Sequence, residues 1–175
     1  MPRNVEIKAR ITSVGALRPI AAALADAGPT PIAQDDTFFA CAAGRLKLRD
    51  FGDGRGELIF YRRDDAAGPK LSSYVRTPTG DPAGLREALA LAHGVVGRVR
   101  KARTLFLAGR SRIHLDEVEG LGAFLELEVV LDDDEPVERG VAEAHALMAR
   151  LGVGPQALVA GAYLDLLRAR GAGRD

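Results

Sequence analysis

The stretch NVEIKARI, residues 4–11, alternates strictly between polar and apolar side chains. Asn4, Glu6, Lys8 and Arg10 hold the polar positions, and an apolar residue follows each of them. A period of two places alternate side chains on opposite faces of a strand, whereas a helix would scatter the same residues around its axis. The stretch therefore predicts a strand with one polar, largely charged face and one apolar face.

Seven further segments have strand-like patterns bounded by turn residues. They span residues 36–40, 45–49, 57–63, 71–76, 96–107, 110–116 and 123–131. We expect the first of these to be an edge strand and the strand at 71–76 to end before Pro78. The Gly-rich and Asp-rich segment 50–56 and the loop 64–69 are expected to connect hairpins.

Helical spacing of apolar residues predicts four helices outside these strands. They span approximately residues 17–28, 84–93, 137–151 and 155–170. Thr12 or Ser13 can cap the first helix, which we expect to end on Gly28 before Pro29. The chain thus combines many antiparallel strands with a few helices.

Length and composition narrow the function classes. The 175 residues fit a single domain, residues 1–175, and 24 basic side chains balance 24 acidic ones. We expect no nucleic-acid partner, because the net charge gives no general affinity for polyanions. One Cys excludes an internal disulfide, and without a signal-like or membrane-spanning apolar run we expect a cytoplasmic protein that does not bind a membrane. We leave open whether it forms a homodimer.

The charged positions fall on one face of each strand, opposite apolar residues. The charged faces carry Glu6 and Lys8, Lys47 and Arg49, Lys101 and Arg103, Arg112, His114 and Asp116, and Glu126 and Glu128. One such strand alone is most often the solvated side of a sheet. Together they favour an α+β fold: a closed or nearly closed antiparallel β-barrel of about eight strands, with helices packed outside and the charged faces lining the interior.

Such an interior implies a ligand, because unpaired buried charges cost several kcal/mol each in desolvation. Arg and Lys suit a chain of phosphates, and carboxylates suit Mg²⁺ or Mn²⁺, which also bind substrate phosphates. Glu126 and Glu128 point the same way from one strand, and Glu6 can converge on them from another. These features predict a metal-assisted polyphosphate site with a small-molecule triphosphate as substrate.

The ordered motifs resemble those of the CYTH family, the triphosphate tunnel metalloenzymes. Residues 4–8 resemble its ExExK signature, residues 44–49 (GRLKLR) its basic second strand, and residues 99–103 (VRKAR) a VxKxR segment. Residues 113–128, with IHLD and FLELE, resemble its HLDxVxxLGxFxExE region. The resemblance covers nearly the whole chain and implies a closed antiparallel tunnel.

The resemblance also implies roles for individual residues. Divalent metal would lie on Glu6, Glu126 and Glu128, and Asp116 would lie near the metal or organise the bases. Lys8, Arg112 and Asp116 would be catalytic. The substrate's phosphates would lie on Lys8, Arg10, Lys47, Arg49, Arg62, Lys70, Lys101, Arg103 and Arg112.

The motifs are most similar to those of class IV adenylyl cyclases, which convert ATP to cyclic AMP and pyrophosphate. The first Glu of ExExK is Asn4 here, so a second metal would be held more weakly. Asp36-Thr37 is followed by Phe38 where thiamine triphosphatases of the family have Tyr, and Tyr61 or Arg62 replaces the usual middle-strand Lys. A triphosphatase acting on inorganic, nucleoside or thiamine triphosphate stays an alternative, as does a non-catalytic polyphosphate or nucleotide-binding module.

Several residues receive a structural interpretation. His114 shares a face with Arg112 and Asp116, but we do not expect it to bind metal, because carboxylates are available to a hard cation. Arg98 and Arg100 fall on the face opposite Lys101 and should lie outside the barrel. We expect Tyr163 to pack in the core beside the apolar residues of the last helix.

Overall fold

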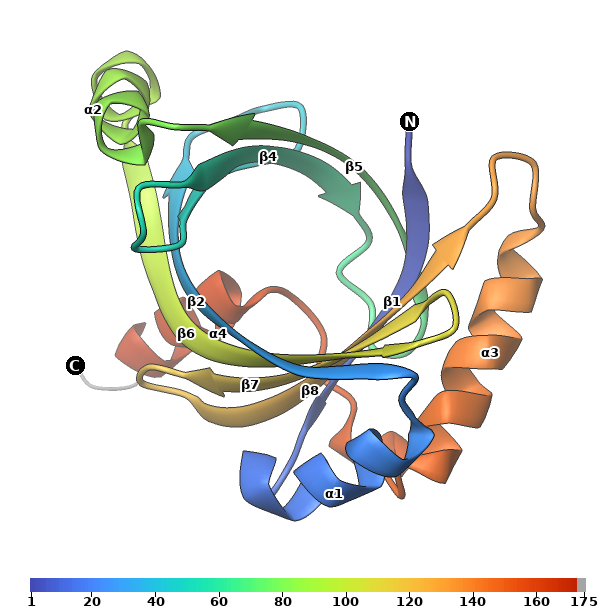
Figure 1. The fold of residues 1–175 in the computed structure, drawn as a ribbon. Coiled ribbons are helices and arrows are strands. Elements are labelled where there is room, and N and C mark those ends of the chain that lie inside the picture. Colours follow the sequence, from blue (N-terminus) through green and yellow to red (C-terminus); the bar gives the residue numbers. More distant parts are fainter. Residues whose placement is uncertain (173–175) are drawn as a thin grey trace.

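A closed ring of eight antiparallel strands forms the centre of the structure, a computed structural model that describes residues 1–172 (Figure 1). The strands are β1 (Arg3–Arg10), β2 (Ala27–Phe39), β3 (Arg45–Asp50), β4 (Gly56–Arg63), β5 (Lys70–Thr79), β6 (Val95–Ala108), β7 (Ser111–Val118) and β8 (Gly122–Leu131). Their order around the barrel is β1-β5-β4-β3-β2-β6-β7-β8, and β1 pairs with β8 to close it. The expected closed barrel is confirmed.

Helices cover the outside of the barrel (Figure 1). They are α1 (Val14–Leu24), α2 (Pro82–His93), α3 (Val137–Arg150) and α4 (Tyr163–Ala172), with a short 3₁₀ turn at Pro155–Ala157. Helix α3 packs on β8 and β1, α1 packs on β7 and β6, and α2 packs on β3 and β2. Ser13 caps α1 by accepting a hydrogen bond of 3.0 Å from the backbone of Ala16. None of these helices, within the described residues, is long and apolar enough to cross a membrane.

The main apolar core lies between the barrel and its helices, outside the barrel wall. It contains Val5 and Ile7 of β1, Leu125, Leu127 and Val129 of β8, and Ala144, Leu147 and Met148 of α3. Gly140 allows the close approach of α3, because a Cβ there would lie 2.6 Å from Leu131 and 2.8 Å from Val5. Burying the apolar faces outward leaves the charged faces directed into the barrel, as the alternation predicted.

Four elements differ from the sequence-based expectation. Strand β2 begins at Ala27 and pairs with both β3 and β6, so it is no edge strand, and α1 ends at Leu24 instead of Gly28. The 14-residue β6 supplies the pairing partner that overrides the weak local pattern of this segment. Strand β5 continues through Pro78, which lies opposite Glu57 of β4.

The fourth difference is the last helix, which begins at Tyr163 instead of residue 155. Residues 158 and 159 instead follow the end of β1: Leu158 bridges Ala9, and the Val159 backbone N–H donates 2.9 Å to the Lys8 carbonyl. This path carries the chain across one end of the barrel. There a second apolar cluster closes the interior; it comprises Phe38, Val99, Val118, Leu121, Phe124, Tyr163 and Leu164.

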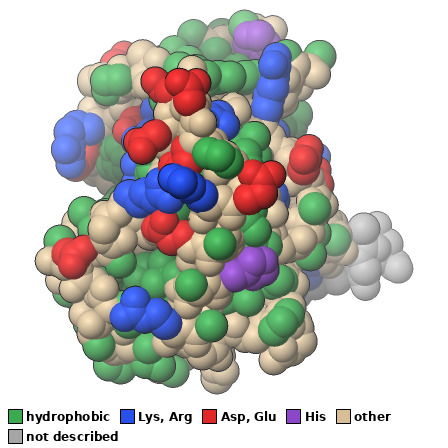
Figure 2. Space-filling view, turned by 90° about the vertical axis from the view of Figure 1, so that its right-hand side faces the viewer, with side chains coloured by type: hydrophobic (Ala, Val, Ile, Leu, Met, Phe, Trp, Pro, Cys, Tyr) green, Lys and Arg blue, Asp and Glu red, His purple; other side chains and the backbone are tan. Residues whose placement is uncertain are grey.

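The face of the molecule that carries α3 shows basic and acidic side chains interspersed (Figure 2). No patch of a single sign gathers there. Eight basic side chains line the barrel interior.

Candidate active site

The barrel interior is a charged cavity that reaches the surface near exposed Arg76 and half-buried Arg112. Its charged lining, among the described residues, is Lys8, Lys47, Arg49, Arg63, Arg76, Lys101, Arg103 and Arg112 against Glu6, Asp36, Glu126 and Glu128. Basic side chains thus outnumber acidic ones by eight to four. The excess of positive charge in an enclosed space favours a polyanionic ligand.

Asp36 of β2 organises the two basic residues of β3. Its carboxylate accepts hydrogen bonds of 2.7 Å from Lys47 Nζ and 2.8 Å from both Nε and Nη2 of Arg49. Burial raises the pKa of Asp36, but the Arg49 and Lys47 charges outweigh this and hold it well below its usual range. Sequence reasoning gave Asp36 no place in the site, although it lies two residues before Phe38 on the inward face.

Asp116 of β7 likewise organises the two basic residues of β6, Arg103 and Lys101. It accepts two bonds of 2.7 Å from Arg103 and one of 2.8 Å from the Tyr163 hydroxyl, while Lys101 Nζ lies 3.7 Å away. Both carboxylate oxygens are therefore engaged by neighbouring side chains. Of the two roles expected for Asp116, this arrangement favours organising the bases over holding a metal.

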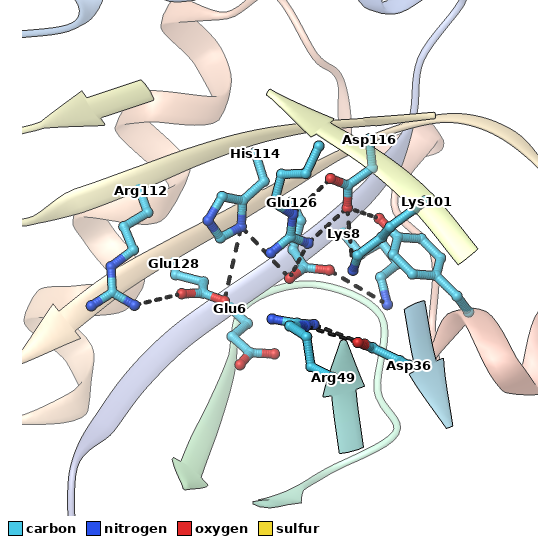
Figure 3. A network of polar contacts seen from close by, with 12 residues as sticks. Glu6, Lys8, Asp36, Arg49, Lys101, Arg112, His114, Asp116, Glu126 and Glu128 are labelled. Carbon is cyan, nitrogen blue, oxygen red and sulfur yellow. Dashed lines mark hydrogen bonds and ion pairs between the residues drawn. The ribbon is translucent and has the colours of Figure 1, made fainter. Parts of the chain in front are cut away.

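A separate acidic group lies toward the Arg112 side of the cavity (Figure 3). Glu126 and Glu128 of β8 and His114 of β7 offer ligand atoms that all lie within 4.8 Å of one another. Glu6 Oε2 accepts 2.8 Å from Arg63 Nη1, and Arg112 donates 3.2 Å to Glu128. Burial raises the pKa of Glu6, against the lowering effect of Arg63. Among the described residues, His114, Glu126 and Glu128 are the one group of three or more acidic, histidine or cysteine side chains close enough to share a cation, and Glu6 lies outside that group.

The donor set fits a divalent cation. Two oxygens from Glu126 and Glu128 face the ring of His114, whose buried Nδ1 has no hydrogen-bond partner among the described residues. Asn4, which is 2% exposed, lines the same cavity with its Oδ1 also unpartnered. Polar atoms that stay unpaired in a buried site are the ones an ion could satisfy.

Lys8 lies where the acidic group meets the closed end of the barrel. Its Nζ donates 3.1 Å to the Gly161 carbonyl, lies 3.9 Å from Glu126 and sits 4.2 Å from the centre of the Tyr163 ring. Burial lowers the pKa of Lys8 to about 7, against the raising effect of Glu126. Burial lowers the pKa of Lys47 to about 7 as well. Both ammonium groups can therefore change protonation near neutral pH.

Three basic residues expected to bind phosphate do not line the cavity. Arg62 points outward and donates 2.8 Å to the Ala43 carbonyl, because the inward positions of β4 are the odd ones. Arg10 is exposed at the end of β1, with its guanidinium 4.9 Å from the Phe124 ring centre. Lys70 is buried, but its Nζ donates 2.9 Å to the Ala66 carbonyl.

Besides Asp36 and Arg76, the structure adds Arg63 and Tyr163 to the site. Arg63, the neighbour of Arg62, lines the cavity with a side chain 7% exposed. Tyr163 lines the cavity too, so it is more than the core residue that its helical spacing suggested. The expected outward position of Arg98 and Arg100 is confirmed, since both contact Asp35 on the outer face.

The family model of the CYTH domain matches residues 2–163 of the chain. The chain belongs to the CYTH family. Comparison with curated proteins finds no significant match.

Solved structures of similar fold extend over almost the whole CYTH chain. The PH1012 protein of Pyrococcus horikoshii is 22% identical with a TM-score of 0.83, covering 94% of this chain and 99% of its own. A putative adenylate cyclase of Vibrio parahaemolyticus is 17% identical with a TM-score of 0.73, covering 94% and 97%. A putative adenylyl cyclase of Hippeastrum, described as having a dominant triphosphatase activity, is 18% identical with a TM-score of 0.68, covering 97% and 96%. At these identities the likeness concerns the fold alone.

Proposed function

We propose that this CYTH protein is a divalent-metal-dependent enzyme that acts on a triphosphate inside the barrel, most like a class IV adenylyl cyclase. It would convert ATP to cyclic AMP and pyrophosphate. The observation that carries the proposal is the order of charges along the cavity, with a basic group at the closed end and the acidic group nearer the open end.

The basic group is the part that supports polyphosphate binding. Lys8 and Lys101 lie 4.2 Å and 4.8 Å from the centre of the Tyr163 ring, at the closed end. Arg103 and Arg49 stand beside them, each already oriented by a buried carboxylate. Arg guanidinium groups bind phosphate oxygens in pairs and Lys supplies a point charge, so this group suits more than one phosphate.

The acidic group indicates which bond is cleaved. A triphosphate that enters by the Arg112 side places its terminal phosphates at the closed end and its organic end toward the surface. Glu6 and Glu128 would then flank the α-phosphorus, and the β- and γ-phosphates would lie among Lys8, Lys101 and Arg103. Leaving-group charge would develop beside these bases, which favours release of pyrophosphate.

Glu126 and Glu128, with Glu6 nearby, would hold Mg²⁺ or Mn²⁺. A bound cation would polarise the phosphate oxygens and neutralise developing charge. The protein's own groups orient the chain of phosphates: Arg49 through Asp36, Arg103 through Asp116. The apolar closure of Phe38, Val99 and Phe124 excludes water from the far end, which strengthens each charge interaction inside.

A triphosphatase is the second candidate. The similar Hippeastrum protein, called a putative adenylyl cyclase, is described as having a dominant triphosphatase activity. Hydrolysis requires a water in line with the γ-phosphorus, whereas cyclisation requires the ribose 3′-hydroxyl in line with the α-phosphorus. The same cavity could serve either nucleophile, and the products decide between them.

The test is to incubate the purified protein with ATP, inorganic triphosphate or thiamine triphosphate, with Mg²⁺ or Mn²⁺, and identify products by chromatography. We expect cyclic AMP and pyrophosphate in equal amounts from ATP. Orthophosphate release from any of the three would identify a triphosphatase instead. Tight ATP binding without turnover would indicate that the protein is a non-catalytic binding module. If AMP binds as tightly as ATP, the cavity does not recognise a polyphosphate chain.

A matched pair of variants tests the acidic group in the same assay. Glu128→Gln should lower metal-dependent turnover more than about 100-fold, since loss of an outer-shell partner alone typically costs 10- to 100-fold in metal affinity or activity. Glu117→Gln on the exposed outer face of β7 should have no effect. Circular dichroism and thermal melting would establish that both variants are folded. Equal activity in the two would place the metal elsewhere.

A further inference from the structure

His114 presents an unpartnered nitrogen to the acidic group. Its side chain is 6% exposed, and Nδ1 is buried without a hydrogen-bond partner among the described residues. Figure 3 shows the ring on β7 directed at Glu126 and Glu128. A buried imidazole nitrogen normally has a hydrogen-bond partner, so the unpartnered Nδ1 needs an explanation, and the proposed reaction does not provide one.

The distances from Nδ1 to one oxygen of each glutamate are compatible with binding to a shared metal ion. Nδ1 lies 3.8 Å from Oε1 of Glu126 and 3.9 Å from Oε1 of Glu128, both too long for a hydrogen bond. Consider two ligand atoms that each lie about 2.1 Å from the same ion. They are about 3.0 Å apart when the ligand–ion–ligand angle is about 90° and about 4.2 Å apart when the ion lies midway between them. The observed separations fall between these limits.

The neighbouring carboxylates of Asp116 and Glu6 are held by short contacts, whereas Glu126 Oε1 has a longer contact of 3.3 Å with Arg103 Nη2. Asp116 accepts bonds from Arg103 and Tyr163, and Glu6 accepts 2.8 Å from Arg63. The second oxygen of Glu128 faces Arg112 at 3.2 Å, which leaves its Oε1 directed at His114. The expectation that histidine is no ligand assumed that free carboxylates are available. Of the carboxylates near His114, Glu126 and Glu128 are the two held by the longest contacts, 3.3 Å and 3.2 Å.

We propose that His114 Nδ1 is a ligand of the metal together with Glu126 and Glu128, and that this nitrogen makes the site select Mn²⁺ over Mg²⁺. Mg²⁺ strongly prefers oxygen and dehydrates reluctantly, whereas first-row transition metals accept imidazole readily. The neutral Asn4 supports the same preference, because a full set of carboxylates would have suited Mg²⁺ better. The inference rests on the metal site of the proposed function, but not on its reaction.

Pulsed electron paramagnetic resonance of the Mn²⁺-loaded protein tests the ligand directly, without substrate. The unaltered protein should show ¹⁴N coupling from a coordinated imidazole, which becomes ¹⁵N coupling when its histidines are labelled. His114→Gln should lose this coupling. His145→Gln, on the exposed surface of α3, should keep it.

Competition between the two ions tests the selectivity. Free Mn²⁺ is measured as Mg²⁺ is added, and the Mn²⁺ preference of His114→Gln should be at least about tenfold weaker than that of His145→Gln, the scale of a lost metal-site partner. Bound Mn²⁺ without nitrogen coupling in the unaltered protein, no Mn²⁺ binding, or an unchanged preference in His114→Gln would each overturn the inference. If the protein turns over ATP but its bound Mn²⁺ shows no nitrogen coupling, only the inference about His114 is wrong. Nitrogen coupling in a protein without turnover rejects only the proposed reaction.

Discussion

The hydroxyl of Tyr163 donates a hydrogen bond of 2.8 Å to Oδ2 of Asp116. This bond joins the first residue of the last helix to the inward face of β7, across the closed end of the barrel. Asp116 also holds Arg103, and the Tyr163 ring lies against Lys8 and Lys101. The segment that closes the barrel is therefore part of the network that orients its bases.

Tyr163→Phe tests what this bond contributes. A hydrogen bond to an ionised group contributes about 1.5–3 kcal/mol, and Asp116 would keep its two bonds from Arg103. We expect the free energy of unfolding, measured by urea denaturation, to fall by about that amount. Tyr74→Phe, which removes a hydroxyl from another residue that lines the cavity, is the control. Equal stability of the two variants would mean that the Tyr163 hydroxyl contributes nothing to holding Asp116.

Arg62 and Arg63 are neighbours in β4 and point to opposite sides of the barrel wall. Substituting each one tests which side of β4 faces the ligand. Arg63→Gln should weaken ATP binding about tenfold, since it removes a charged phosphate donor and leaves Glu6 unpaired. Arg62→Gln should bind ATP as the unaltered protein does. Calorimetric titration with ATP compares the two, with thermal melting as the check on folding. Weaker binding in Arg62→Gln alone would reverse the assignment of faces.

Arg62 and Arg63 also show which inward-facing residues the sequence could not predict. In β1, β7 and β8 the strict alternation fixed which residues face inward, and the structure confirms the inward side for Glu6, Lys8, Arg112 and Glu126. In ELIFYRR, by contrast, four consecutive residues are apolar or aromatic and two arginines follow. Without alternation, only the pairing of β4 with β3 and β5 decides that the odd positions face the cavity.

Tyr163 packs in the core as expected, but its place in the cavity lining was not predicted, for a different reason. A periodic apolar pattern shows that one side of a helix is buried, but not which part of the molecule buries it. That depends on residues 158 and 159 running beside β1 and bringing the helix to the barrel end. Such long-range backbone contacts leave no local trace in the sequence.

Asn4→Glu tests the consequence of the amide in the first strand. An added carboxylate should tighten Mn²⁺ binding about tenfold, because affinity for hard cations follows the number of charged ligands. Without metal, the variant should be less stable than the unaltered protein, since a fourth carboxylate joins Glu6, Glu126 and Glu128. Calorimetry gives the affinity, and melting with and without Mn²⁺ gives the stability. Asn4→Gln controls for side-chain length. If Asn4→Glu and Asn4→Gln bind Mn²⁺ alike, position 4 is no part of the metal site.

Burial lowers the pKa of Lys8 and Lys47 to about 7 from an ordinary 10.5, so the stability of the protein should depend on pH. Between these two values the unfolded chain binds more protons than the folded, ligand-free protein. The free energy of unfolding of the free protein should therefore rise with pH across that window, as far as these two groups determine it. Chemical denaturation at several pH values measures this slope, which Lys8→Arg and Lys47→Arg should each reduce.

Binding of ATP should reverse the effect of burial on these lysines. Phosphate oxyanions beside the ammonium groups favour the charged form and raise its pKa. At about pH 8.5 the free protein holds both lysines mostly neutral, so ATP binding in EDTA should take up about one to two protons. Calorimetry in two buffers of different ionisation enthalpy measures this number, and each Lys→Arg variant should take up about one proton fewer, because Arg stays charged. ATP binding with no proton uptake in the unaltered protein would show that neither lysine receives the phosphates.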